Sequence, residues 1–285
     1  MKKHLWILCM FISIGNLFAQ VKPAYVIFNA KGKKVSHKKM MQSLKKTDVL
    51  LFGEYHNNPI VHWLQLEITK ELGESRQLVL GAEMFERDNQ PALDAYLQGK
   101  ITAKGLDSSA RLWNNYKTDY APLVNYAKAK QLTFVATNVP RKYASMVSRG
   151  GFKALDTLSA LEKSWMAPLP IAYDSTLPGY KNMLEMMPGH ANAGNFPKAQ
   201  AIKDATMAYF ILKYHTVGAL SIHYNGSYHS DNNEGIGWYI QQQQPQLKRA
   251  TISTVLQADV KKLLVENMGK ADFIICIDED MTTTY

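Results

Sequence analysis

Apolar runs that end in polar residues and lead into a helix recur along this chain, and they restrict its fold more than any other feature. In residues 48–72, an apolar run at 49–52 ends at Gly53, and Pro59 follows with Asn57 or Asn58 as the N-cap of a helix. A short continuous apolar run is typical of a strand buried on both faces of a parallel sheet. We therefore predict an α/β fold with a mostly parallel central sheet and helices on both faces.

The same alternation predicts the remaining elements. The predicted strands are 25–28, 49–52, 78–85, 132–136, 217–224, 251–256 and 273–277. The predicted helices are 36–44, 60–72, 92–112 with a break near Gly105, 121–131, 142–163, 200–214 and a segment that opens at 235. Residues 280–285 are rich in Thr, and we expect them to be frayed.

Polar side chains stand at the end of several predicted strands, where open α/β sheets bind their ligands. Glu54 and His56 follow one strand, and Glu83 ends the next strand along the chain. Because consecutive β–α units usually place their strands side by side, we expect Glu83 to lie beside Glu54 and His56. Further candidates are Asn138, Arg141 and His229 at such ends, and His62 early in the helix that follows the loop.

Two of these residues have a second interpretation. Glu83 fits either a ligand site or an ion pair with Arg87, which follows it on the same loop. Arg141 fits either an anionic group of a ligand or an ion pair at the start of a helix. The aromatic cluster of Trp113, Tyr116 and Tyr120 belongs either to the core or to the wall of a cleft.

The spacing G-x-x-H occurs twice, at 53–56 and at 226–229, each time where a strand gives way to a loop and a helix. His56 and His229, with a carboxylate from Glu54 or Glu83, could hold a divalent metal ion with one position open for water. His62 is a further candidate ligand, and the remaining glutamate would be the general base. A metal-free Glu–His pair that activates water is a variant. The alternative is a buried polar network that only holds the loops.

Residues 164–198 differ in composition, because Pro and Met are frequent there. Met fills irregular apolar surfaces, and loops of this length are commonly functional. We predict a helical lid inserted in a single domain of residues 20–285. The alternative is a small helical sub-domain that covers one end of the sheet.

The first residues have the pattern of a signal peptide, with Lys2 and Lys3, an apolar run at 5–14 and cleavage predicted after Ala19. We therefore expect an exported protein, periplasmic or associated with the outer membrane. Cys276 would be the remaining cysteine, which excludes an intramolecular disulfide. Removing two lysines from a charge of +9 leaves +7, which favours anionic ligands. The lysines are spread along the chain, so no nucleic-acid partner is expected.

An ordered set of motifs resembles the ChaN-like haem-binding uptake family, which belongs to a superfamily with the Tiki and TraB proteins. The resemblance extends from about residue 45 to 260. The motifs that carry it are GEYHNNPIVHWLQ at 53–65, EMFERDNQ at 83–90, Trp113 with YAPL at 120–123, TNVPR at 137–141, QAIKDATMA at 200–208 and NGSYH at 225–229.

The resemblance implies an exported haem-binding protein of haem or iron uptake, with an outer-membrane uptake partner and homodimers that share stacked haems. It also implies a Tyr as the iron ligand, and the candidates in or beside the lid are Tyr173, Tyr180, Tyr209 and Tyr214. Arg141 is the candidate cation for a haem carboxylate. The Tiki-like relatives imply the alternative function, a metal-dependent hydrolase acting as a peptidase or esterase, with His56 and His229 at the matching positions beside Glu54 and Glu83.

Overall fold

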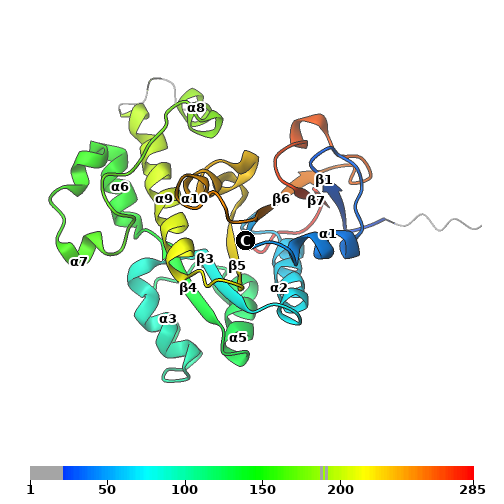
Figure 1. Ribbon diagram of the computed structural model, residues 1–285, viewed down its shortest axis with the longest axis horizontal. Coiled ribbons are helices and arrows are strands. Elements are labelled where there is room, and N and C mark those ends of the chain that lie inside the picture. Colours follow the sequence, from blue (N-terminus) through cyan, green and yellow to red (C-terminus); the bar gives the residue numbers. More distant parts are fainter. Residues whose placement is uncertain (1–21, 187–188, 190–191) are drawn as a thin grey trace, which may run out of the picture.

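The computed structural model describes residues 22–186, 189 and 192–285, so the predicted signal peptide at 1–19 lies outside the described residues. In this part of the chain the strands form one seven-stranded sheet in the order β1-β7-β6-β2-β5-β3-β4 (Figure 1). β1 is antiparallel to β7, and the other pairs are parallel. The strands are β1 (Tyr25–Asn29), β2 (Val49–Glu54), β3 (Leu78–Glu86), β4 (Thr133–Asn138), β5 (Leu220–Gly226), β6 (Arg249–Gln257) and β7 (Phe273–Asp278).

Helices cover both faces of the sheet, which confirms the predicted α/β fold. Leu50 and Phe52 of β2 point to the side packed by α1, α2, α3 and α5, whereas Val49 and Leu51 point to the side packed by α6, α9 and α10. The two groups of helices lie on opposite sides of the strands in Figure 1. The helices are α1 (His37–Leu44), α2 (Pro59–Gly73), α3 (Gln90–Leu97), α4 (Ala103–Ser109), α5 (Ala121–Ala129), α6 (Arg141–Gly150), α7 (Ala160–Lys163), α8 (Pro178–Glu185), α9 (Phe196–Tyr214) and α10 (Ile236–Gln243).

Helix α2 begins as its sequence predicts. Asn58 is the N-cap, and its side-chain oxygen accepts hydrogen bonds from the backbone N–H groups of Ile60 and Val61. Pro59 occupies the first turn, where its missing N–H group is not needed. This cap places His62 one turn into the helix and directly behind the end of β2. None of the described helices is long and apolar enough to cross a bilayer.

Two boundaries differ from the sequence prediction. The break expected near Gly105 lies instead at 98–102, because Gly99 has a φ of +74° and Thr102 caps α4 by accepting a hydrogen bond from the N–H of Gly105. The helix expected at 142–163 stops at Gly150, and Gly151, with a φ of +66°, follows it. A positive φ ends a helix because glycine adopts it without a steric cost.

The described part of the predicted lid at 164–198 consists of turns and irregular chain, α8 and the first residues of α9, and it packs on α9 and α10. The hydroxyl of Tyr239 donates to the main-chain oxygen of Ala172 at 2.6 Å. The N–H of Gly179 donates to the carboxylate of Glu234 at 2.6 Å. These contacts attach the segment to α10 and to the loop that precedes it. That this segment acts as a lid stays a prediction.

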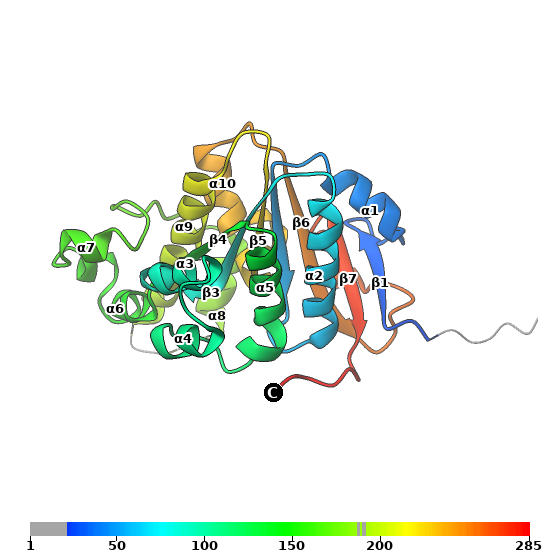
Figure 2. The same ribbon diagram turned by 90° about the horizontal axis from the view of Figure 1, so that it is seen from below.

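The C-terminal segment is attached to the rest of the chain by hydrogen bonds of Thr284, which differs from the frayed end that was expected. The segment after β7 runs along the edge of the sheet where the parallel strands end (Figure 2). The N–H of Thr284 donates to the main-chain oxygen of Asn57 at 2.9 Å, and its hydroxyl donates to the carboxylate of Asp119 at 2.7 Å. These partners come from distant parts of the sequence, so composition did not reveal them.

Candidate functional site

The predicted polar residues meet at the carboxyl ends of β2, β5 and β3, but the strand order that brings them together differs from the one expected. β2 and β3 are not neighbours, because β5 pairs with both of them. Glu83 nevertheless lies near His56, because Gly226 at the end of β5 has no side chain. A Cβ atom added there would stand 2.7 Å from His56 Nε2 and 3.6 Å from Glu83 Oε2.

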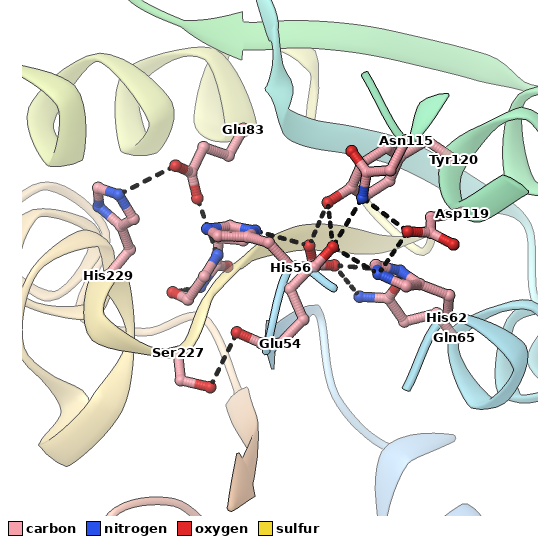
Figure 3. A network of polar contacts seen from close by, with 12 residues as sticks. Glu54, His56, His62, Gln65, Glu83, Asn115, Asp119, Tyr120, Ser227 and His229 are labelled. Carbon is pink, nitrogen blue, oxygen red and sulfur yellow. Dashed lines mark hydrogen bonds and ion pairs between the residues drawn. The ribbon is translucent and has the colours of Figure 1, made fainter. Parts of the chain in front are cut away.

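Glu54 is buried and receives three hydrogen bonds (Figure 3). Its Oε1 atom accepts from the hydroxyl of Tyr120 at 2.7 Å and contacts His56 Nδ1 at 2.9 Å. Its Oε2 atom accepts from Gln65 Nε2 at 2.5 Å. These contacts hold the carboxylate and leave the His56 ring turned toward Glu83. The ring also lies against Trp113, with centroids 4.8 Å apart.

The pKa of His56 lies above its ordinary value. Burial opposes the charged form, but the hydrogen bond with Glu54 and the nearby carboxylate of Glu83 outweigh that effect. About a third of the His56 side chain remains exposed, with a relative accessibility of 33%, whereas Glu54 is enclosed. His56 is therefore a group that can exchange a proton with a bound molecule.

His62 holds the loop rather than facing a ligand, so the prediction that it binds a metal ion finds no support in the geometry. Its Nε2 atom lies 3.1 Å from the main-chain oxygen of His56, and its Nδ1 atom lies 3.2 Å from Gln65 Oε1. Asn115 donates to the same His56 oxygen at 2.7 Å and to the carboxylate of Asp119 at 2.6 Å. The sequence analysis did not single out Asn115 or Asp119, because both precede α5 and follow no strand.

His229 is buried between two carboxylates. Its Nε2 atom lies 3.2 Å from Glu83 Oε1, and its Nδ1 atom lies 2.5 Å from Asp204 Oδ1. Burial opposes the charge on His229, yet the two carboxylates raise its pKa to about 10. The charged His229, together with His56 and the N–H of Gly226, holds the pKa of Glu83 well below its usual range in spite of burial.

Asp204 is a third site residue that was not singled out from the sequence, besides Asn115 and Asp119. It lies on α9, is almost completely buried, and accepts a further hydrogen bond from the hydroxyl of Tyr180 at 3.0 Å. An acidic residue inside an apolar helical stretch was the signal that could have identified it. α9 is buried on most sides between the sheet and the segment at 164–186.

An open cleft of about 600 Å³ begins at Glu83 and extends over the ends of β3 and β4. Asn138 forms part of its wall, donates to the main-chain oxygen of Glu83 at 3.0 Å, and has a buried Oδ1 atom with no partner among the described residues. Arg141 and Lys203 also line the cleft and form no ion pair in the described structure. The remaining lining residues are Glu86, Arg111, Leu112, Trp113, Asn114, Asn115, Val139 and Tyr285.

The predicted metal centre is not supported by the arrangement of its donors. In residues 22–186, 189 and 192–285, no group of three or more His, Cys, Asp or Glu side chains is placed to hold a metal ion. His56 faces Glu54, and His229 faces Glu83 and Asp204, so each ring forms ion pairs with carboxylates. The two G-x-x-H motifs therefore converge on Glu83 without forming a ligand set.

Of the residues predicted to bind haem, Arg141 lines the cleft and the four tyrosines do not. The hydroxyl of Tyr180 donates to Asp204, and the hydroxyl of Tyr214 accepts from Arg87 Nη2 at 2.8 Å. Tyr173 stacks on Tyr180 with centroids 5.6 Å apart. Tyr209 packs edge-on against its neighbour Phe210 on α9. The structure thus separates these tyrosines into two environments.

Comparison with known proteins agrees with this fold and with the motifs. The family model described as haem-binding uptake, Tiki superfamily, ChaN matches residues 40–240. The structure of ChaN from Campylobacter jejuni, which is described with cofacial haem binding, is similar with a TM-score of 0.68 and 20% identity, covering 89% of this chain and 97% of that one.

A second solved structure, described as a succinoglycan biosynthesis protein, has a TM-score of 0.50 and 11% identity, covering 85% of this chain and 90% of that one. At such identities the similarity of the two structures shows the fold alone. A search of curated proteins found no match. The family model covers more than two thirds of the sequence. The chain therefore belongs to the ChaN haem-binding uptake family of the Tiki superfamily.

Proposed function

We propose that this chain is an exported haem-binding protein that takes part in haem or iron uptake together with an outer-membrane partner. The observation that carries the proposal is the match to the haem-binding uptake family over residues 40–240. The similar ChaN of Campylobacter jejuni is described with cofacial haem binding. Export rests on the pattern of a signal peptide at residues 1–19.

The cleft has the properties needed to bind the edge of haem that carries the two propionate groups. Its volume of about 600 Å³ lies within the range of ligand pockets, and Trp113 and Val139 give it apolar walls. Arg141 and Lys203 have no carboxylate partner in the described structure, so their charges are available for the two haem propionates. Haem is the cargo in this proposal, and the protein has only to hold and orient it.

None of the four tyrosines predicted as iron ligands lines the cleft, so each of them would have to reach the iron from outside its lining. Tyr180 and Tyr214 already use their hydroxyls in hydrogen bonds with Asp204 and Arg87. Tyr173 has no such bond in the described structure and lies in the predicted lid, so it is the candidate that we favour for the axial position. Tyr209 also lacks such a bond and remains the next candidate.

Titration of the mature chain with haem, followed by absorbance, tests the proposal. We expect a saturable Soret band whose ligand-dependent features disappear in Tyr173→Phe and persist in Tyr180→Phe and Tyr214→Phe. The variant Arg141→Gln/Lys203→Gln loses the two proposed ion pairs with the haem propionates, so its affinity for haem should fall by about tenfold or more. Lys100→Gln/Lys104→Gln, which removes equal charge from an exposed region, is the control. A spectrum that does not saturate would contradict haem binding.

The predicted homodimer is tested with the same material. If two protomers share stacked haems, sedimentation velocity should show a larger particle with haem than without it. Tyr173→Phe should lose this change if its phenol holds the iron. A particle of unchanged size at saturating haem would contradict the shared arrangement and leave binding by a single protomer.

A hydrolase is the second candidate function, and the partly exposed His56 is the observation that favours it. In spite of burial, its pKa is raised by the hydrogen bond with Glu54 and by the carboxylate of Glu83, which favours the protonated ring, and its Nδ1 contact with Glu54 leaves the ring turned toward Glu83 at the edge of the cleft. A protonated imidazole in this position can donate a proton to a leaving group. Chromogenic esters and peptides are suitable substrates, and His56→Gln should lose any turnover that the wild type shows. Equal turnover by both proteins would exclude His56 from such a reaction.

A further inference from the structure

Two loops at the β1–β7 edge of the sheet form a protruding surface with apolar residues at its tip. The loop at 258–272 joins β6 to β7, and the turn at 30–34 follows β1 (orange-red and blue in Figure 1). Val265 has an exposed fraction of 77% and Leu264 of 48%, and Met268 is exposed as well. The N–H of Gly269 donates to the main-chain oxygen of Ala30 at 2.9 Å, so the two loops form one surface. We call residues 30–34 and 258–272 the basic loop surface.

Hydrogen bonds and buried apolar residues at the base of the loop fix the position of its apolar tip. Gln257 is buried, and its Nε2 atom donates to the main-chain oxygens of Asp259 and Lys262 at 3.1 and 3.0 Å. Its Oε1 atom accepts from the N–H of Leu264 at 3.1 Å and from Asn267 Nδ2 at 2.9 Å. Beneath the loop, Val260, Leu263 and Ala271 are packed in a buried cluster. The loop therefore buries three of its apolar residues while a satisfied polar network directs Leu264 and Val265 to solvent.

Lysines surround this tip. The basic loop surface contains six lysines and three acidic residues, a net charge of +3. The six are Lys31, Lys33, Lys34, Lys261, Lys262 and Lys270, and none of them forms an ion pair in the described structure. One of the acids, Asp272, is already engaged by the N–H and hydroxyl of Thr251. The other two acids are Asp259 and Glu266, so the surface as a whole keeps a net positive charge.

We propose that the basic loop surface docks the protein peripherally on an anionic lipid membrane. Exposed apolar side chains at the tip of a protruding loop can enter the headgroup region, and the lysines around them attract anionic headgroups. An acidic polymer without apolar groups would pair with the lysines but would leave Val265 and Leu264 exposed to water. β1–β7 and β3–β4 lie at opposite edges of the sheet, so docking leaves the cleft beside Glu83 open. The proposal is independent of haem binding.

Cosedimentation of the mature chain with vesicles tests the proposal. We expect binding to vesicles of phosphatidylcholine with about 30% phosphatidylglycerol and weaker binding to phosphatidylcholine alone. Rising salt should reduce it because mobile ions screen exposed charges. Lys261→Glu/Lys262→Glu and, separately, Val265→Asp should each lower the partition coefficient about tenfold or more. Circular dichroism and the haem titration verify that each variant is folded.

Matched control variants distinguish the effect of this surface on vesicle binding from the effect of the net charge of the protein. Lys100→Glu/Lys104→Glu changes the net charge equally at the β4 side of the molecule, and Val217→Asp changes a residue that is 96% exposed elsewhere. Both controls should bind vesicles like the wild type. Absence of binding to the anionic vesicles would overturn the proposal. Equal losses of vesicle binding in the test and control variants would also overturn it. So would a soluble polyglutamate that competes fully with the vesicles and binds Val265→Asp as tightly as the wild type. That result would indicate an acidic protein partner.

Discussion

His229 carries a charge inside the protein because two carboxylates face its ring. Glu83 and Asp204 contact opposite nitrogens, and the hydroxyl of Tyr180 donates to the second carboxylate. Removing one partner from a buried ion pair leaves an uncompensated charge and typically costs about 3–5 kcal/mol. Single substitutions in this group should therefore affect stability as well as ligand binding. Any test of function at Glu83 or His229 needs a measurement of folding beside it.

We expect His229 to make the stability of the protein depend on alkaline pH. Its pKa rises from an ordinary value of 6.5 to about 10 in the folded state, so the folded protein retains a proton that the unfolded chain loses. The resulting stabilisation is complete below about pH 6.5 and is lost as the pH rises through about 10. The lowered pKa of Glu83 acts oppositely, because its contribution is present above about pH 4.5 and is lost as the pH falls further.

Urea unfolding at pH 6, 8 and 10 measures this dependence. The free energy of unfolding of the wild type should decline over this range, whereas His229→Gln should be less stable at pH 6 and show a smaller decline. His37→Gln is the control, because His37 forms an exposed pair with Glu71 at 2.8 Å. Equal pH dependence in the wild type and His229→Gln would contradict a charged His229.

At the scale of elements, the site is held by segments that are distant in sequence. The loop after β2 carries His56, and the turn before α5 supplies Asn115 and Asp119 (Figure 3). The C-terminal segment supplies Thr284. Thr284 bonds both the main chain of Asn57 and the carboxylate of Asp119. The C-terminal segment therefore braces the loop that positions His56.

Thr284→Val should loosen this loop. The change removes a hydroxyl that donates to the buried carboxylate of Asp119, and loss of such a bond typically costs about 0.5–1.5 kcal/mol. We expect a lower free energy of unfolding in urea and faster hydrogen exchange at residues 55–58. Thr282→Val is the matched control, because the hydroxyl of Thr282 forms no hydrogen bond in the described structure. Unchanged exchange in Thr284→Val would show that the segment does not brace the loop.

At the scale of the whole molecule, one sheet is shared by the helical layers on both of its faces. Leu50 and Phe52 pack in one layer and Val49 and Leu51 in the other, so neither layer can be lost without exposing the same strand. We expect urea unfolding to show one transition that coincides in circular dichroism and tryptophan fluorescence. Trp165, in the predicted lid segment, reports on that region. An earlier transition in fluorescence, abolished by Trp165→Phe, would identify the lid as a separate unit.

The alternation of strand, loop and helix could be predicted from the sequence because it depends on local hydrophobic periodicity and caps. Val49–Glu54 follows the apolar run at 49–52, and Asn58 caps α2 as its residue type favours. The placement of Glu54, His56, Glu83 and His229 at strand ends follows from the same local pattern. The boundaries at Gly99 and Gly151 could not be placed in this way, because a positive φ is decided by how the chain continues.

The sequence by itself determined which residues stand at the ends of strands in this protein, and the resemblance carried by its motifs indicated the family. Only the tertiary structure decided that β5 lies between β2 and β3, that Gly226 makes room for His56, and that Asp204 reaches His229 from α9. Strand order depends on long-range pairing, which no local periodicity records. Burial then pairs the charges of these residues, because an isolated charge in the interior is too costly to retain.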